Sequence, residues 1–357
     1  MGLEDFNNIE PYALNRNEKD ALLTKRLKEL TLHHYNNCIE YKKIIDSLNV
    51  DIENPKSVID IPFLPVRIFK EYELKSIANI AKTMTSSGTT GQKVSKIFVD
   101  SVTASNQQKA MIRIVSSFIG NKRLPMIILD SESVLKDRNM FSARGAGILG
   151  FSIFASKRIY AFDKDMNLNI DAITSFIDEH KGETILLFGF TFMIWQYFYK
   201  KLLSATNIKI DLSNAVLIHG GGWKKLENES ISSEDFKKCL HDVCGINRVH
   251  DYYGMVEQTG CIYMECEHGH LHASNYSDII IRNHIDFSEC EIGTKGIIQV
   301  VSSLPESYPG HSILTEDEGV ILGIDDCKCG RKGKYFEILG RIQNAEIRGC
   351  SDTFESK

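Results

Sequence analysis

The sequence predicts an α/β protein with a mainly parallel sheet, helices around it, and a β-rich region toward the end of the chain. From about residue 97, short apolar runs alternate with amphipathic stretches, a pattern typical of parallel sheets covered by helices. Glycine-rich segments follow several of the expected strands, and ligand sites in such sheets lie at the carboxyl ends of strands. Beyond Gly260 the chain changes to short β-like runs.

The size and composition of the chain are those of a soluble globular protein. Its 357 residues are 43% hydrophobic and 25% charged, which allows a large core. A net charge of -5 without a long basic stripe gives no indication of nucleic-acid binding. We find no export signal and no membrane span, so we expect a cytoplasmic protein whose nine cysteines are reduced thiols or metal ligands.

The first 70 residues are expected to be helical and then extended. Between Lys19 and Asp46, leucines recur near helical spacing with lysines between them, which predicts an amphipathic helix packed on the main body. The segment Ile61–Lys70 contains two prolines, which disfavour helix in the residues before them. We therefore expect an extended connection there.

The alternating region of the chain supplies the expected sheet and its helices. The predicted strands are Pro125–Asp130, Arg158–Phe162, Thr184–Gly189, Ala215–His219 and Arg248–Tyr253. The predicted helices are Asn167–His180, Phe192–Leu203 with an aromatic stripe, and Ser233–Cys244 with a serine cap. Later β-like runs are Asp278–Arg282 and Gly296–Ser302.

The segment Thr85–Lys96 has the composition of a loop that wraps a polyphosphate. Its glycines allow close backbone approach, while N–H groups, hydroxyls and lysines face phosphate oxygens. A Walker A loop is excluded, because that motif needs four residues between its glycines and a lysine directly after the second. A plain Ser/Thr/Gly linker remains the alternative. The candidate phosphate ligands are Thr85, Ser86, Ser87, Gly88, Thr89, Thr90 and Gly91.

Two further segments follow expected strands. Leu217–Lys224 contains three glycines, which leave room for a flat ring, although a tight strand–helix turn would look the same. In Asp251–Glu257, Tyr253 could stack on a purine and Glu257 could hold magnesium between phosphates. The alternative for Glu257 is a surface side chain at a strand end.

These motifs, in this order, resemble those of the acyl-adenylate-forming enzymes. The loop reads Ser-Ser-Gly-Thr-Thr-Gly with a following lysine, Gly-Gly-Gly-Trp-Lys comes later, and Tyr-Gly-x-x-Glu follows. Leu314–Gly319 and Leu339–Arg341 resemble the ribose-binding and hinge motifs. The similarity is greatest to acyl-protein synthetases of the LuxE type, which are related to phenylacetate-CoA ligases. It implies the fold of the adenylate-forming N-terminal domain, with the usual small C-terminal lid domain absent.

The resemblance also implies roles for individual residues, with ATP and magnesium as cofactors. The phosphates would contact Thr89 and Thr90, and magnesium would bind Glu257. The adenine and ribose contacts would come from Gly221, Gly222, Trp223, Tyr253, Gly254, Asp317 and Arg341. One departure is Val256, where the family usually has threonine before the glutamate. Its missing hydroxyl removes an expected phosphate contact.

Cysteines and histidines form a second constellation in Cys266–His272 and Cys327–Cys329. Thiolates and imidazoles suit tetrahedral zinc, but scattered reduced cysteines with surface histidines are the alternative. Phenylacetate-CoA ligases carry a similar set that binds structural zinc. On that resemblance the ligands would be Cys266, His272, Cys327 and Cys329, with His268 and His270 in reserve.

The tail contains Cys350, which could be an ordinary free thiol or a nucleophile toward an acyl phosphate. Arg348 could favour its thiolate. Acyl-protein synthetases carry an acyl-accepting cysteine at this place. The catalytic lysine of the lid domain has no counterpart, so we consider Lys93, Lys96 and Lys224 for charge neutralisation, with Lys93 as the prediction.

The resemblance therefore implies an AMP-forming ligase that acts on a fatty acid. It would make acyl-AMP, transfer the acyl group to Cys350 as a thioester, and pass it to a partner such as a fatty-acid reductase. The rivals are an acyl-CoA or carrier-protein ligase and a non-catalytic adenylate-binding zinc scaffold.

We expect four segments: a helical N-terminal segment over residues 1–60, a nucleotide-binding core over 61–260, a β-rich subdomain over 261–345 and a tail over 346–357. The run Phe188–Phe198 is either an acyl channel or core.

Overall fold

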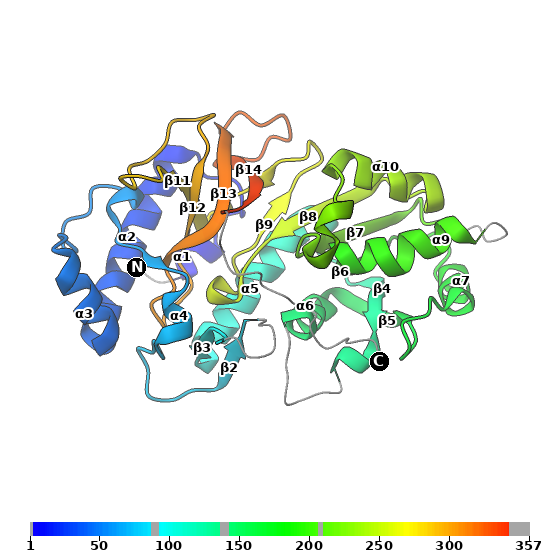
Figure 1. Ribbon diagram of the computed structural model, residues 1–357, viewed down its shortest axis with the longest axis horizontal. Coiled ribbons are helices and arrows are strands. Elements are labelled where there is room, and N and C mark those ends of the chain that lie inside the picture. The colour runs from blue at the N-terminus through cyan, green and yellow to red at the C-terminus, as the bar shows by residue number, and fades with distance from the viewer. Residues whose placement is uncertain (1–2, 87–92, 136–142, 206–209, 343–357) are drawn as a thin grey trace. The chain divides into compact units, whose positions relative to one another are not determined.

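The computed structural model describes residues 3–86, 93–135, 143–205 and 210–342, and these form two compact units (Figure 1). Unit 1 contains the described residues up to 118 and from 254 onward, and unit 2 contains those from 119 to 253. The predicted helical N-terminal segment and the predicted β-rich subdomain thus belong to the same unit. The four-segment organisation itself stays a prediction.

Unit 2 is built on a parallel sheet, as the alternating pattern predicts. Its strands lie in the order β5-β4-β6-β7-β8, and every neighbouring pair is parallel. All residues of β6 and β7 are buried, which explains their continuous apolar runs. The strands are β4 (Leu124–Ser131), β5 (Ala155–Phe162), β6 (Ile185–Phe190), β7 (Ala215–Gly220) and β8 (Arg248–Tyr253).

Helices flank this sheet, and Figure 1 shows them beside its strands. They are α6 (Ala143–Phe151), α7 (Ile170–Glu179), α8 (Thr191–Met193), α9 (Lys200–Ser204) and α10 (Ser233–Cys244). The Ser232 hydroxyl accepts a hydrogen bond from the Asp235 backbone N–H at 3.0 Å, which caps α10 as predicted. The predicted helix over Phe192–Leu203 is confirmed as a continuous helical run, in which the stretch Ile194–Tyr199 between α8 and α9 is π-helical.

Unit 1 contains a mainly antiparallel sheet, which confirms the predicted β-rich region. Its order is β11-β12-β13-β14-β10-β9, with β1 (Leu64–Pro65) pairing parallel to β13. The strands are β9 (Tyr263–Glu265), β10 (Leu271–His272), β11 (Ser277–Arg282), β12 (Gly296–Ser302), β13 (Ser312–Ile324) and β14 (Lys334–Arg341). A separate antiparallel hairpin is formed by β2 (Lys82–Thr85) and β3 (Lys96–Val99).

The helices of unit 1 differ from the prediction in three ways. They are α1 (Glu4–Asn7), α2 (Arg16–Asn37), α3 (Ile39–Leu48), α4 (Ile68–Glu71) and α5 (Ser101–Ile119). The single predicted helix ends at Cys38, whose extended backbone (φ -128°, ψ 107°) separates α2 from α3. The end of Ile61–Lys70 is helical, because α4 begins three residues after the second proline. Helix α5 was not predicted.

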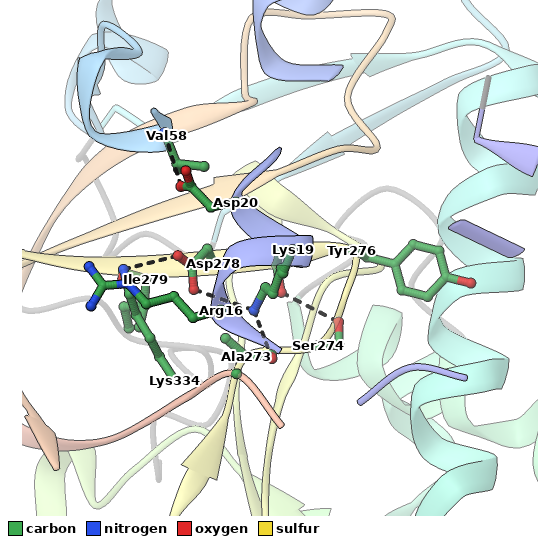
Figure 2. Close-up of polar contacts among 12 residues, drawn as sticks. Arg16, Lys19, Asp20, Val58, Ala273, Ser274, Tyr276, Asp278, Ile279 and Lys334 are labelled. Atoms are coloured by element: carbon green, nitrogen blue, oxygen red, sulfur yellow. Dashed lines mark hydrogen bonds and ion pairs between the residues drawn. The ribbon is translucent and has the colours of Figure 1, made fainter. Parts of the chain in front are cut away.

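Buried charges fix α2 to the sheet of unit 1 (Figure 2). Lys19 Nζ donates to the Ala273 carbonyl at 3.0 Å and lies 3.3 Å from Asp278 Oδ1. Lys334 Nζ lies 3.0 Å from Asp278 Oδ2, so the carboxylate is held by two lysines from different elements. Burial acts to raise the pKa of Asp278, but the two lysines lower it by more. The pKa of this carboxyl therefore lies below its usual value.

None of the helices in the described ranges is long and apolar enough to cross a membrane.

Candidate functional site

The predicted phosphate loop is carried by the β2–β3 hairpin. Thr85 pairs with Lys96 in the antiparallel register, and beyond them the Ser86 N–H donates to the Ser95 carbonyl at 3.1 Å. The Ser95 N–H donates in turn to Ser86 Oγ at 2.9 Å. Thr85 and Ser86 therefore form the base of the loop. The other predicted loop residues, Ser87, Gly88, Thr89, Thr90 and Gly91, lie outside the described residues.

Two of the lysines considered for charge neutralisation, Lys93 and Lys96, occupy surface positions. Lys93 Nζ lies 2.7 Å from Glu71 Oε2, and Lys96 Nζ lies 3.0 Å from Glu73 Oε1. All four side chains are at least half exposed, and such surface pairs contribute roughly 0–1 kcal/mol each. Either lysine can therefore leave its partner at little cost. The side chain of Lys224 is outside the described set.

The glycine-rich turn and Tyr253 lie at the carboxyl ends of adjacent parallel strands. Gly220 of β7 is in register with Tyr252 of β8, so the residues that follow each strand emerge at one edge of the sheet. Gly221 and Gly222 have positive φ values of +85° and +63°. A Cβ on Gly221 would lie 2.7 Å from Cδ1 of Phe190, whereas one on Gly222 would meet nothing within 4 Å. The turn needs glycine for backbone conformation and, at Gly221, also for space.

Trp223 packs into an aromatic cluster directly after these glycines. Its ring lies 5.2 Å from that of Trp195 and 5.9 Å from that of Phe236, both in edge-on orientation. Tyr252, the neighbour of the predicted Tyr253, stacks at 6.4 Å on Phe188. Because alternate residues of a strand point to opposite faces, Tyr252 and Tyr253 lie on different faces of the sheet.

The run Phe188–Phe198, predicted as either acyl channel or core, contributes several buried side chains to the core of unit 2. Phe188 is fully buried and stacks on Phe151 at 4.2 Å. Ile194 and Phe198 have no exposed surface. These three side chains are part of the buried interior of unit 2.

The Glu257 side chain is fully buried in unit 1, so it is not the surface side chain of the alternative interpretation. It lies in the 3-10 turn Val256–Gln258, which begins two residues after Gly254. The neighbouring Gln258 amide donates to the carbonyls of Val300 and Gly310 at 3.1 and 2.8 Å, which fixes the turn. Burial, and then the Glu257 charge, raise the pKa of Tyr308. A buried carboxylate of this kind is a suitable ligand for a hard cation such as magnesium.

The two predicted ribose-binding residues face each other across adjacent strands. Asp317 of β13 is in register with Arg341 of β14, and Arg341 Nε lies 3.6 Å from Asp317 Oδ1. Arg341 also lies 3.0 Å from the Glu316 carboxylate, and the Asp317 N–H donates to Thr315 Oγ1. The structure thus brings together a partly exposed carboxylate and a guanidinium, which together can bind a diol.

Four predicted metal ligands converge in unit 1, although their two sequence segments are far apart. The ligand atoms of Cys266, His272, Cys327 and Cys329 all lie within 4.8 Å of one another. Cys266 Sγ is 3.9 Å from Cys327 Sγ, and Cys329 Sγ is 3.4 Å from His272 Nε2. Tetrahedral zinc with bonds of about 2.3 Å to sulfur and 2.0–2.1 Å to nitrogen requires separations of about 3.8 Å and 3.6 Å. The cluster therefore fits zinc.

Burial keeps the Cys266 and Cys327 thiols and the imidazole of the cluster in their neutral forms when no cation is bound. Burial raises the pKa of Cys266, and it raises that of Cys327 to about 12. Burial lowers the pKa of His272 to about 3, so its imidazole is neutral and able to donate a lone pair. Of the reserve ligands, His270 lies closer, with Nδ1 3.4 Å from Cys327 Sγ.

One residue at this cluster escaped the sequence prediction. Arg331 lies two residues after Cys329 and forms an ion pair with Glu267 at 3.0 Å. The only sequence signal for it is an arginine two residues after the Cys-x-Cys pair. The acceptor candidate Cys350 lies outside the described residues.

Comparison with known proteins gives one family match and two curated relatives at low identity. A family model described as "Acyl-protein synthetase, LuxE" matches residues 5–357. A long-chain-fatty-acid–luciferin-component ligase of Aliivibrio fischeri is 22% identical over 355 residues, which cover 96% of this chain and 90% of that protein. The ligase of the same name from Vibrio harveyi is 21% identical, with 96% and 89% covered.

Solved structures of 2-hydroxyisobutyryl-CoA ligase have a similar fold. The complex with 2-HIB-AMP and CoA in the thioesterification state matches with a TM-score of 0.71 and 14% identity, covering 94% of this chain and 70% of that one. An open conformation of the same ligase gives a TM-score of 0.68 at 13% identity, with 93% and 71% covered. At this identity the similarity concerns the fold alone, and it confirms the predicted α/β class of the adenylate-forming ligases.

Proposed function

Because the chain belongs to the acyl-protein synthetase family LuxE, matched over residues 5–357, we propose that it is an AMP-forming long-chain-fatty-acid–protein ligase. The family match carries this proposal, and it agrees with the resemblance that the motifs indicate. The names of the two curated relatives support a long-chain fatty acid as substrate. The reaction has an activation step and a transfer step.

In the activation step, a carboxylate oxygen of the fatty acid attacks the α-phosphorus of ATP. An oxygen–phosphorus bond forms, the bond to the bridging oxygen breaks, and pyrophosphate leaves with its electron pair. Magnesium held by Glu257 would neutralise phosphate charge. The task of the chain is to position the reactants and balance charge, with Asp317 and Arg341 on the ribose and Gly221 and Gly222 beside the adenine.

The opposed pair Asp317 and Arg341 supports the ribose assignment. The two side chains come from paired strands and lie 3.6 Å apart, which places a carboxylate and a guanidinium side by side. Lys93 is assigned to charge neutralisation, because its exposed pair with Glu71 is weak enough to exchange for phosphate.

In the transfer step, the thiolate of Cys350 attacks the acyl carbon of acyl-AMP. A carbon–sulfur bond forms, the bond between the acyl carbon and the phosphate oxygen breaks, and AMP leaves, while the thiol proton passes to solvent. The thioester is then a form that a protein partner, such as a fatty-acid reductase, can accept. We place this chemistry in the cytoplasm, where cysteine thiols stay reduced.

Zinc is proposed as a structural ion held by Cys266, His272, Cys327 and Cys329. The separations between their ligand atoms support this assignment. With four protein ligands the site is closed, so zinc would cross-link β10 to the turn before β14 and would not take part in acyl transfer.

Acid-dependent ATP–pyrophosphate exchange tests the activation step. With tetradecanoate as the acid, we expect exchange by the wild type and a loss of roughly 10–100-fold in Asp317→Asn, because a charged hydrogen-bond partner contributes about 1.5–3 kcal/mol. Glu318→Gln, which removes the same charge from the next residue of β13, is the control and should retain exchange.

Two results would contradict the activation step. Exchange that does not require the acid would exclude acyl activation. Equal exchange by Asp317→Asn and the control would remove the ribose assignment. An acyl-CoA ligase remains the second candidate, and acyl transfer to CoA by Cys350→Ser would favour it over self-acylation.

A further inference from the structure

Thr191 belongs to none of the nucleotide motifs, yet its hydroxyl contacts the glycine-rich turn that follows β7. It is the first residue after β6, and it is buried in unit 2. Thr191 Oγ1 donates to the Gly220 carbonyl at 3.2 Å and lies 3.0 Å from His219 Nδ1. One buried hydroxyl therefore bonds the last residue of the neighbouring strand and also the residue before it.

The chemistry of these groups determines the direction of the hydrogen bonds. A hydroxyl has a single hydrogen, and here it goes to the Gly220 carbonyl, which can only accept. The contact with His219 then requires the imidazole to donate from Nδ1. Asp251 Oδ1 lies 3.6 Å from the same nitrogen, and its negative charge favours a proton there. The hydrogen bonds thus run from His219 through Thr191 to the backbone.

The bonded carbonyl belongs to the peptide that opens the turn. A peptide unit is planar, so a bond that fixes the Gly220 carbonyl also fixes the direction of the Gly221 N–H. Glycine itself restrains this peptide little, because it has no Cβ. Phe190, the residue before Thr191, packs its ring against Gly221, where a Cβ would lie 2.7 Å from Cδ1. Two consecutive residues therefore support the turn, one through packing and the other through its hydroxyl.

The two ends of the turn share an aromatic partner. The ring of Phe236 on α10 lies 4.9 Å from that of His219 and 5.9 Å from that of Trp223. His219 precedes the glycines and Trp223 follows them, so both flanks are anchored on one helix. The Gly221 peptide between these anchors has no such side chain, and the Thr191 hydroxyl supplies the bond that orients it.

We propose that Thr191 is a positioning residue of the nucleotide site, whose hydroxyl, oriented by His219, holds the peptide between Gly220 and Gly221 in the orientation that receives adenine. This inference rests on the proposed function, which places Gly221 and Gly222 beside the adenine of ATP. Thr191 acts through the peptide and not by contact with the nucleotide. Without the hydroxyl the peptide can rotate, so ATP binding weakens while binding of the fatty acid does not change.

The test measures acid-dependent ATP–pyrophosphate exchange by the full-length chain, first as a function of ATP concentration and then of tetradecanoate concentration. Thr191→Val keeps the shape of the side chain but removes the hydroxyl. It should raise the KM for ATP by about 3–10-fold, the effect of one hydrogen bond, and leave the KM for tetradecanoate and the maximal rate unchanged. Thr191→Ser retains the hydroxyl and should have a KM for ATP close to that of wild type.

Thr31→Val is the matched control. Thr31 is a buried threonine of unit 1 whose hydroxyl also donates to a backbone carbonyl, that of Leu27 at 2.8 Å. It also lies near a histidine nitrogen, 2.9 Å from His311 Nε2. Both valine variants lose a buried hydroxyl with the same kinds of partner, so urea denaturation should show similar losses of stability. Only Thr191→Val should change the KM for ATP.

A KM for ATP in Thr191→Val that rises no more than in Thr31→Val would overturn the inference and leave the proposed function intact. An equal rise in the KM for tetradecanoate would also overturn it, since a general loss of structure affects both substrates. If Thr191→Val does not fold, His219→Phe replaces it, because phenylalanine keeps a ring but lacks the Nδ1 donor. An unchanged KM for ATP in that variant would overturn the inference. A wild type without acid-dependent exchange would contradict the activation step and, with it, the inference.

Discussion

At the scale of single residues, the turn after β7 depends on glycine for two separable reasons. Both Gly221 and Gly222 have positive φ, which side-chain-bearing residues rarely adopt. Only Gly221 also lies against another side chain, the ring of Phe190. Any alanine there must therefore accept a strained backbone and displace a buried ring.

This difference gives a prediction for the two positions. Gly221→Ala should lower the free energy of unfolding by roughly 1–3 kcal/mol more than Gly222→Ala does, the usual cost of overpacking a core. Urea denaturation of both variants measures the difference, and the shared backbone strain cancels. Equal losses would mean that Phe190 moves aside without cost.

Lys19 is a buried charged residue whose loss would leave another buried charge with one partner fewer. Removing it leaves the fully buried carboxylate of Asp278 with Lys334 as its remaining close cation. Loss of one partner from a buried ion pair typically costs 3–5 kcal/mol, because the other charge stays desolvated. Because Lys19 belongs to helix α2 and Asp278 to strand β11, this loss would weaken the attachment of the helix to the sheet.

At the scale of elements, α2 is fixed by its charged first turns as well as by its apolar stripe. Leu23, Leu27 and Leu30 are buried on one face of the helix. Near its start, Lys19 bonds the Ala273 carbonyl directly after strand β10, as Figure 2 shows. Ala273 also directly follows the proposed ligand His272, so the helix and the metal cluster support the same strand end.

We therefore expect Lys19→Met to destabilise unit 1 by roughly 3 kcal/mol, the lower end of the range for a broken buried pair, because Lys334 remains. Lys25→Met, an exposed lysine on the same helix, is the control and should cost less than about 1 kcal/mol. Thermal unfolding of both variants tests this. A Lys19→Met protein as stable as the control would show that apolar packing alone anchors α2.

Sequence patterns predicted some elements well and others poorly, for physical reasons. The bounds of β8, β12 and α10 match the predicted ranges, because a glycine or a capping serine marks at least one end of each element. The break at Cys38 was missed, since the apolar spacing continues through it. Helix α5 has only five buried positions among nineteen residues, so its polar sequence concealed it.

At the scale of the whole molecule, some components of the candidate site could be predicted from the sequence and others could not. The four proposed metal ligands were chosen on the resemblance to phenylacetate-CoA ligases, since the residue types alone left scattered cysteines open, and the structure brings the four side chains together. The opposition of Asp317 and Arg341 required the register of β13 and β14, which no local pattern contains.

The central claim is that this acyl-protein synthetase acylates itself on Cys350. The direct measurement is incubation of the full-length protein with ATP, magnesium and radiolabelled tetradecanoate, followed by a denaturing gel. Wild type, Cys350→Ser and Cys290→Ser should be compared, since Cys290 is a partly exposed thiol outside the proposed zinc site. We expect a hydroxylamine-labile label in wild type and Cys290→Ser and none in Cys350→Ser. A label that persists in Cys350→Ser, or acid-dependent pyrophosphate exchange without any label on wild type, would contradict it.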